Sequence, residues 1–474
     1  MSAPLEKLLR DARIDLILSR IEKDESVIDE LINFLDSDSR SIKFNSIHAL
    51  GLLGQKSING VSKVINCLED EDWSICREAA RTLGNIGTSA KEAVSKLSFL
   101  LDDKEASIRK EAAIALGKIK NPTPESISSL IKALDDDDGE VRTEAVKALG
   151  EIGSDASEAI PHLMKSLKDI SWTVRTASAQ SISQIGKGSI KAIPDLLKAL
   201  EDDDWRVRFR VVNTLVEIGE PVIPHLTEIL DSKKVIVRKE VVETLGEMKI
   251  SNETLIDKMS KLLFDRHESV RGKTADALRS IGKHAIPALL KAYEKSKTKM
   301  KIIILSALGG IGTEAKEALP MIINILTTRE QEIEYIPSFT TKIRRAILTF
   351  LKDPFKKRSS VRVEAARALG RIGIDSEYAL HALETALNDT KGHVRREAAL
   401  AIGKLGLIAE KAIPSLIKAL KDENRDVRWR SSEALGIIGV NTEAVISNLN
   451  NLVHDKCDYV CESAILAIDN LTEQ

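Results

Sequence analysis

Three side chains near the C-terminus have the types and spacing of a zinc site. His454, Cys457 and Cys461 lie three and four residues apart, so they would share one face of a helix. Three such ligands would leave one zinc coordination position open. However, Cys461 occupies a position that carries Arg in most copies of a repeated segment, as does Cys76, and this favours small buried cysteines. We therefore expect no metal and no cofactor here.

Other catalytic signatures are missing from the sequence. It contains no Gly-rich phosphate loop, nucleophile elbow or zinc-protease motif. We therefore assign no catalytic residue, and no small-molecule substrate is evident. The 70 basic and 72 acidic residues give a net charge of −2, which does not favour a nucleic-acid-binding protein. No apolar run has membrane-spanning length, and the four cysteines favour a reducing cytoplasm.

The sequence repeats itself with a period of about 33 residues. One copy runs from Val141 to Gly153, and its apolar residues have the spacing of an amphipathic helix. A second helix follows, and in several copies it begins at a proline, which is tolerated in the first turn. The thirteen copies begin at Ile42, Ile75, Ile108, Val141, Val174, Val207, Val237, Val270, Met300, Val361, Val394, Val427 and Val460.

Helix pairs of this length stack in layers and bury one continuous core. The fold class that we predict is therefore all-α, an α-solenoid (α/α superhelix) of about thirteen helix pairs. We expect capping helices over residues 1–40, repeats 1–9 over 41–328, an insert over 329–360, and repeats 10–13 with a C-terminal cap over 361–474.

The repeated unit resembles a known family. The pattern Val-Arg-x-Glu-Ala-Ala-x-Ala-Leu-Gly-x-Ile-Gly, followed by Ala-Ile-Pro-x-Leu-Ile-Lys-Ala-Leu-x-Asp, is similar to the HEAT-like repeat named after phycobilisome lyases. The resemblance covers roughly residues 25–472 and implies the fold rather than one function. Related repeats build deoxyhypusine hydroxylases, which hold two irons between His-Glu pairs. In such a pair the His would directly precede the repeat's Glu. Here the residue before that Glu is Arg77, Lys110, Thr143, Lys239, Val363 or Arg396. None of these is a histidine, so a metal-dependent oxidoreductase is disfavoured.

Aspartate and arginine recur six residues apart in seven units. The Asp lies in the turn between repeats, where it can cap the next helix, and the Arg can bond that Asp or a neighbour's. The resemblance to HEAT repeats implies a structural ladder. Its expected members are Asp103, Arg109, Asp136, Arg142, Asp169, Arg175, Asp202, Arg208, Asp265, Arg271, Asp389, Arg395, Asp422 and Arg428.

One segment interrupts the repeat. Residues 329–358 make one unit longer than the others by almost a whole period, and positions 342–358 contain seven basic residues and one acidic residue. Insertions in repeat arrays are often binding elements, although a degenerate repeat with solvated charges is the alternative. The candidate partner-binding residues of the insert are Lys342, Arg344, Arg345, Phe355, Lys356, Lys357 and Arg358.

Three tryptophans share one position at an edge of the predicted stack. Trp73, Trp172 and Trp205 each precede the first apolar residue of the pattern by two positions. They could cover the core between repeats or contact a partner. The resemblance to HEAT-like proteins implies that the second helices line the inner curve, so a row of lysines on them, including Lys132 and Lys165, could face a partner or form a solvated face.

Together these features predict a non-enzymatic, cytoplasmic scaffold that binds a protein through its concave face and the 329–358 insert. A nucleic-acid or other phosphate-rich partner is the alternative suggested by the basic insert. We expect no membrane partner.

Overall fold

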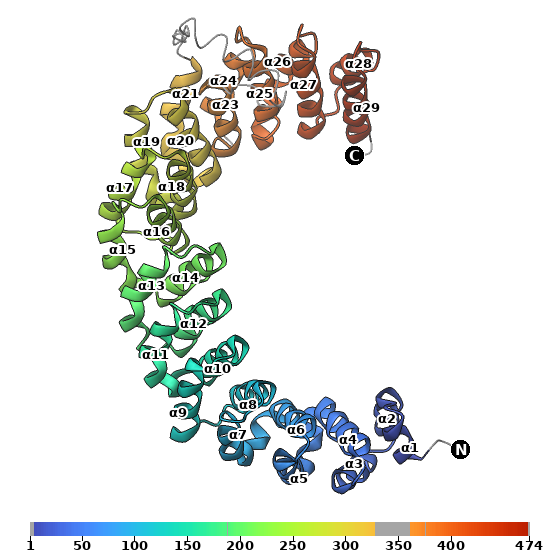
Figure 1. Cartoon of the computed structure of the whole chain (residues 1–474). Helices are drawn as coiled ribbons and strands as arrows, with labels where there is room; N and C mark the ends of the chain where they lie inside the picture. Colours follow the sequence, from blue (N-terminus) through green and yellow to red (C-terminus); the bar gives the residue numbers. More distant parts are fainter. Residues whose placement is uncertain (1–3, 187, 328–360, 375, 473–474) are drawn as a thin grey trace, which may run out of the picture. The chain divides into compact units, whose positions relative to one another are not determined.

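The chain forms a stack of helices (Figure 1). The computed structural model describes residues 4–186, 188–327, 361–374 and 376–472. Over these ranges all regular secondary structure is helical, and thirteen long helices alternate with shorter ones. The prediction of an all-α solenoid is confirmed.

The long helices correspond to the thirteen copies of the repeated pattern. They are α4 (Arg40–Leu53), α6 (Trp73–Ile86), α8 (Ala106–Ile119), α10 (Gly139–Ile152), α12 (Trp172–Ile185), α14 (Trp205–Ile218), α16 (Val235–Glu247), α18 (Glu268–Ile281), α20 (Thr298–Ile311), α23 (Val361–Ile372), α25 (Gly392–Ile402), α27 (Arg425–Ile438) and α29 (Asp458–Thr472).

The remaining helices are shorter. They are α1 (Leu5–Arg10), α2 (Ile14–Ile21), α3 (Val27–Asn33), α5 (Val61–Asn66), α7 (Val94–Leu100), α9 (Pro124–Lys132), α11 (Ile160–Ser166), α13 (Ile193–Ala199), α15 (Ile223–Ile229), α17 (Glu253–Ser260), α19 (Ile286–Glu294), α21 (Leu319–Thr327), α24 (Glu377–Ala386), α26 (Ile413–Ala419) and α28 (Glu443–Leu452). The 3-10 segments are η1 (Phe34–Asp36), η2 (Gly54–Gly60), η3 (Cys67–Glu69), η4 (Gly87–Ala93), η5 (Ala133–Asp135), η6 (Gly153–Ala159), η7 (Ser189–Ala192), η8 (Glu220–Val222), η9 (Lys261–Phe264), η10 (Gly282–Ala285), η11 (Gly312–Ala318) and η12 (Gly406–Ala412).

Helix α10 shows why these segments are helical. Val141, Ala145 and Leu149 recur every four residues, and all three side chains are buried. The carboxylate of Asp138 caps the start of the helix by accepting hydrogen bonds from the amides of Glu140 and Val141. The helix ends at Ile152 and is followed by Gly153, whose φ of 77° would be strained in a residue with a Cβ atom.

Neighbouring long helices approach closely at a recurring glycine. A Cβ atom on Gly84 of α6 would lie 2.9 Å from the Cα of Ala115 in the next long helix, α8. In the same way, a Cβ on Gly309 of α20 would lie 3.1 Å from the Cα of Ala368 in α23. The insert separates Gly309 from Ala368 in the sequence, yet the contact between the flanking repeats has the ordinary form.

The chain divides into two units, residues 1–244 and residues 245–474. In the first unit the long helices α4–α14 lie along the inner side of the curve, and the short helices α5–α13 lie along its outer side (Figure 1). The expectation that the second helices line an inner curve is therefore wrong for this unit. No helix in the described ranges is long and apolar enough to cross a membrane.

Candidate functional site

The ladder arginines connect successive repeats. In Arg142, Nε lies 2.8 Å from Oδ2 of Asp169 and Nη2 lies 3.0 Å from Oδ1, so the guanidinium donates two bonds to one carboxylate. Asp169 belongs to the next unit along the chain. The same two-bond contact joins Arg109 to Asp136, Arg175 to Asp202, Arg395 to Asp422 and Arg428 to Asp455.

Each of these arginines also contacts the aspartate six residues before it. The bond goes to the backbone: Nη1 of Arg142 donates to the carbonyl oxygen of Asp136 at 2.8 Å. The Asp136 carboxylate in turn accepts the amide of Asp138 at 2.8 Å. The contacts of Arg109, Arg175, Arg208, Arg271, Arg395 and Arg428 with the Asp103, Asp169, Asp202, Asp265, Asp389 and Asp422 carbonyls have the same form.

Other residues occupy the arginine position in some repeats. In the first repeat, Lys43 Nζ lies 2.9 Å from Asp70 Oδ2. In the last, the Cys461 thiol donates to the carbonyl oxygen of Asp455 at 3.1 Å, which is the bond that an arginine makes elsewhere. Repeat 6 differs as well, because Arg208 reaches the carboxylate of Glu240 at 3.3 Å.

The ladder changes the acidity of its aspartates. The hydrogen bond from Arg428 holds the pKa of Asp455 below its ordinary value, although partial burial opposes this. For Asp136 burial is the largest influence and raises the pKa. The hydrogen bonds from Arg109 and from the Asp138 amide, with the positive charges of Arg109 and Arg142, outweigh burial, so the net pKa of Asp136 is lowered. These carboxylates are therefore ionised and paired at neutral pH.

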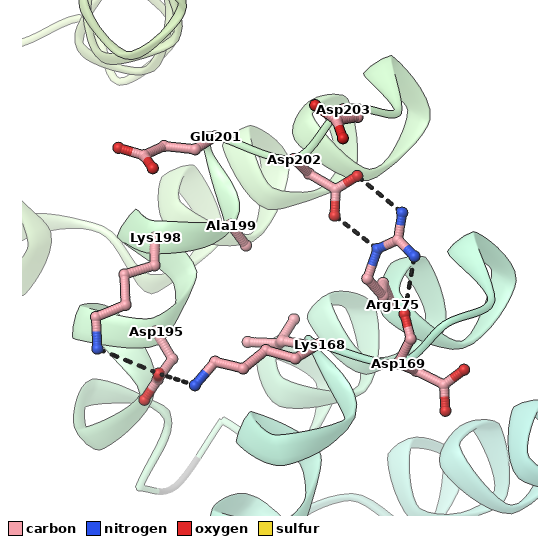
Figure 2. A pocket seen from close by; sticks show the side chains of 10 residues that line it. Lys168, Asp169, Arg175, Asp195, Lys198, Ala199, Glu201, Asp202 and Asp203 are labelled. Carbon is pink, nitrogen blue, oxygen red and sulfur yellow. Dashed lines mark hydrogen bonds and ion pairs between the residues drawn. The ribbon is translucent and has the colours of Figure 1, made fainter. Parts of the chain in front are cut away.

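A cavity of about 390 Å³ lies beside the ladder, lined by the turn after α11, by Arg175 of α12, and by α13 with the turn that follows it (Figure 2). Arg175 stands at one side of it with Asp169 and Asp202, and Asp195 stands at the other between Lys168 and Lys198. Asp195 Oδ1 lies 3.4 Å from Lys168 Nζ and 3.6 Å from Lys198 Nζ. Because these charges compensate one another, the cavity extends the ladder and supplies no reactive group.

A second set of ion pairs joins the long helices, and the sequence did not predict it. Arg81 Nη2 lies 2.9 Å from Glu111 Oε1 in the next repeat, and Arg81 Nη1 lies 3.5 Å from Glu78 Oε2. Glu78 also contacts His48 Nδ1 of the preceding repeat at 2.8 Å. Arg367 connects Glu364 and Glu397 similarly. The feature of the sequence that could have indicated these ion pairs is a basic residue three positions after the repeat's Glu.

The zinc-type trio does not form a metal cluster in the described ranges. There, no group of three or more His, Cys, Asp or Glu side chains could hold a metal ion. Cys457 and Cys461 are half-buried free thiols. Cys67 and Cys76 are buried, and burial raises the pKa of each thiol to about 11.

The three tryptophans are partly exposed to solvent. They begin the long helices α6, α12 and α14, and their exposed fractions are 46% for Trp73, 37% for Trp172 and 65% for Trp205. The guanidinium carbon of Arg206 lies 3.5 Å from the centre of the Trp172 ring, and that of Arg77 lies 5.0 Å from the centre of Trp73. Such cation–π contacts hold the rings in place while leaving much of their surface free.

The candidate residues of the insert lie outside the described residues. This applies to Lys342, Arg344, Arg345, Phe355, Lys356, Lys357 and Arg358. The lysines on the second helices are described, and three of them, Lys132, Lys165 and Lys291, pair with acidic residues of the preceding repeat. Lys132 contacts Asp102 at 2.7 Å, and Lys165 contacts Asp135 at 2.8 Å.

The chain belongs to the HEAT-repeat family. HEAT repeats match residues 28–108, 61–138, 97–183, 172–236, 223–309, 344–414 and 405–469, which together make up most of the sequence. No curated protein matches it.

Several solved structures are similar. One is an engineered protein of the Northeast Structural Genomics Consortium, 25% identical over 40% of this chain and 96% of that one, with a TM-score of 0.34. A second is a designed armadillo repeat protein in complex with a (KR)4 peptide. It is 22% identical over 40% of this chain and 99% of the designed protein, with a TM-score of 0.35. A third is Kap95p with RanGDP. It is 11% identical over 95% of this chain and 72% of that one, with a TM-score of 0.46.

Proposed function

We propose that this HEAT-repeat chain is a scaffold that binds a protein partner. The observation that carries the proposal is the set of exposed aromatic rings at one recurring position of the long helices, Trp73, Trp172 and Trp205. Exposed tryptophan is favoured at protein interfaces because it buries a large area at little entropic cost. In the first unit these helices form the inner side of the curve (Figure 1), and the proposed contact lies at their N-terminal ends, where the tryptophans stand.

The insert is a second proposed contact region. Its candidate residues carry a local positive charge, since positions 342–358 hold seven basic residues against one acidic residue. A long insertion at one point of a regular array costs the stack little and can present side chains to a partner.

Affinity capture from the native organism followed by mass spectrometry tests the proposal. The bait is the full chain, compared with a Trp172→Ala/Trp205→Ala variant and with a chain lacking residues 330–357. We expect the full chain to retain a specific protein that at least one variant loses. Recovery of no protein above the background of a blank resin would contradict the scaffold function. Equal recovery by all three baits would contradict both contact regions.

The charge of the insert also supports a second candidate, a phosphate-rich partner such as a nucleic acid. Binding would then weaken steeply as salt rises, because counterions are released when phosphates are neutralised. Replacing Arg344, Arg345, Lys356 and Lys357 with Gln would reduce the slope of log affinity against log salt. An unchanged slope in an electrophoretic titration with duplex or single-stranded DNA would reject this candidate.

Three finer assignments accompany the proposal. We propose that the repeats are of the phycobilisome-lyase-like HEAT type, on the residue pattern quoted above. We also propose a cap over 1–40, repeats over 41–328, an insert over 329–360 and repeats over 361–474. A reducing cytoplasm is proposed because the four cysteines are free thiols.

A further inference from the structure

Three repeats carry a basic residue, Arg210, Lys273 or Arg430, at a position where six others carry a glutamate, and in two of the three an aromatic residue precedes it. Helix α14 contains the run Val207–Arg210 (Val-Arg-Phe-Arg), and helix α27 contains Val427–Arg430 (Val-Arg-Trp-Arg). At the fourth place of this run other repeats carry a glutamate, namely Glu78, Glu111, Glu144, Glu240, Glu364 and Glu397. The repeats with Arg210 and Arg430 therefore combine an aromatic ring with an arginine on the long helix.

In α27 the arginine is neutralised within the chain. Arg430 forms an ion pair with Glu433, one turn further along the helix, and its guanidinium carbon lies 3.7 Å from the centre of the Trp429 ring. Trp429 in turn meets Tyr459 edge to face, with ring centres 5.5 Å apart. This run is complete without a partner.

In α14 the corresponding contacts are missing. The position equivalent to Glu433 is Asn213, which carries no charge. Within the described part of the chain, Nε of Arg210 is buried without a hydrogen-bond partner, and so is Oγ1 of Thr176 on α12. The carboxylates of Asp204 and Glu240 pair with Arg206 and Arg208. Arg210 is thus partly buried and has no ion-pair partner among the described residues, so a ligand carboxylate would supply its counter-charge.

Two exposed rings lie on the same helix as this cation. Phe209 is 55% exposed and lies four residues after the more exposed Trp205, so the two rings share one face of α14. Trp172 occupies the same repeat position on α12 as Trp205 does on α14, and Arg206 packs over it. Only 3% of the chain is aromatic, so three exposed rings on two successive long helices are an unusual concentration of exposed apolar surface.

We propose that the surface made by Trp172, Trp205, Phe209 and Arg210, called here the α12–α14 face, binds an acidic peptide segment of the protein partner. Apolar side chains of that segment pack on Trp205 and Phe209, and one of its carboxylates pairs with Arg210. A continuous phosphate backbone fits less well, because Asp203 and Asp204 lie at the start of the same helix. The inference rests on the proposed scaffold function and specifies its partner chemistry.

Selection from a phage-displayed library of random dodecapeptides on the full chain tests the charge of the ligand. We expect enrichment of Asp and Glu together with aromatic or aliphatic residues. Peptides synthesised from the enriched set are then titrated by isothermal calorimetry against the chain and its variants.

The decisive variant adds a charge and removes no contact. Asn213→Glu places a carboxylate one turn from Arg210, as Glu433 is placed from Arg430, so peptide affinity should fall at least tenfold. Phe209→Ala should also weaken binding at least tenfold. Asn213→Gln and Trp429→Ala are the matched controls and should bind within about twofold of the parent chain. Circular dichroism verifies that each variant is folded.

Several results would overturn the proposal. They are failure to enrich any peptide, enrichment of Lys- and Arg-rich peptides, and affinity that is the same for Asn213→Glu and Asn213→Gln. Tighter binding of a short oligothymidine than of any peptide, lost in Asn213→Glu, would assign the face to nucleic acid instead. None of these outcomes affects the capture of a partner protein by the full chain, so the scaffold function is judged separately.

Discussion

At the scale of single residues, the ladder arginine connects three structural elements at once. Arg142 bonds the carboxylate of the next repeat and the Asp136 carbonyl of its own turn, while the Asp136 carboxylate receives Arg109 from the repeat before. Each link therefore depends on the geometry of two repeats. The ladder side chains are therefore mostly shielded from solvent, although each of them carries a full charge.

Removal of one ladder arginine should be costly. In Arg142→Met the carboxylate of Asp169 loses its bidentate partner, and both side chains of this pair are only 12% exposed. We expect the free energy of unfolding, measured in urea, to fall by about 3 kcal/mol. Lys165→Met breaks an ion pair whose side chains are 71% and 70% exposed and should cost less than about 1 kcal/mol. Equal losses would contradict a structural role specific to the ladder.

The lowered aspartate pKa values predict how stability depends on pH. The pKa values of Asp136, Asp169 and Asp455 are lower in the folded chain than their ordinary value near 3.8. Their stabilising contribution is complete above that value and is lost as pH falls through the lowered folded pKa values. Urea titrations should show a nearly constant free energy of unfolding from pH 7 to about 5 and a decline below about pH 4.

Two observations refine this expectation. Burial raises the pKa of Glu240, so its contribution has the opposite sign and decreases as pH rises through the raised value. Replacing both Asp136 and Asp169 with Asn removes two of the lowered groups and should make the acid decline shallower. An acid decline as steep as that of the parent chain would contradict the assignment.

At the scale of helices, the recurring glycine is a packing requirement. Alanine is favoured over glycine in a helix by about 1 kcal/mol, so Gly→Ala in an open helix should stabilise. In Gly84→Ala the added methyl would lie 2.9 Å from the Ala115 backbone of the neighbouring helix, and α6 and α8 would have to separate. We expect this variant to lose about 1–3 kcal/mol of unfolding free energy.

Gly272 provides the matched control for that substitution. It lies in α18, and an added Cβ would meet no atom within 4 Å. Gly272→Ala should therefore gain about 0.5–1 kcal/mol. If both variants gained stability, close packing would not be the reason for the recurring glycine.

The period, the helices, the turn aspartates and the close glycine contacts could be predicted from the sequence because each is a local pattern repeated along the chain. The second set of ion pairs could not, because Arg81 meets Glu111 only after two successive long helices are placed side by side. The resemblance to HEAT-like proteins implied that the second helices lie on the inner side of the curve, which the first unit contradicts (Figure 1). The distinction between Arg210 and Arg430 likewise depends on three-dimensional contacts.

At the scale of the whole molecule, the array is a series of nearest-neighbour contacts. Each Arg–Asp pair joins one repeat to the next, and each close glycine contact also lies between two adjacent repeats. In such an array the effect of a local change is confined to its own repeat and the adjacent ones. The contact between Gly309 and Ala368 has the ordinary form, so the two repeats that flank the insert are direct neighbours in the stack.

This continuity predicts that the insert can be deleted without loss of stability. Removing residues 330–357 gives Gly309 and Ala368 the same sequence separation as Gly84 and Ala115, and it leaves residues 328, 329 and 358–360 to join α21 to α23. Connections of the same length, residues 200–204 and 420–424, join α13 to α14 and α26 to α27. The free energy of unfolding should therefore change by less than about 1 kcal/mol. As a control, deletion of residues 172–199, a segment of equal length, removes α12 and α13 and should severely destabilise the first unit. A loss of several kcal/mol in the chain lacking 330–357 would mean that the insert is part of the packed array.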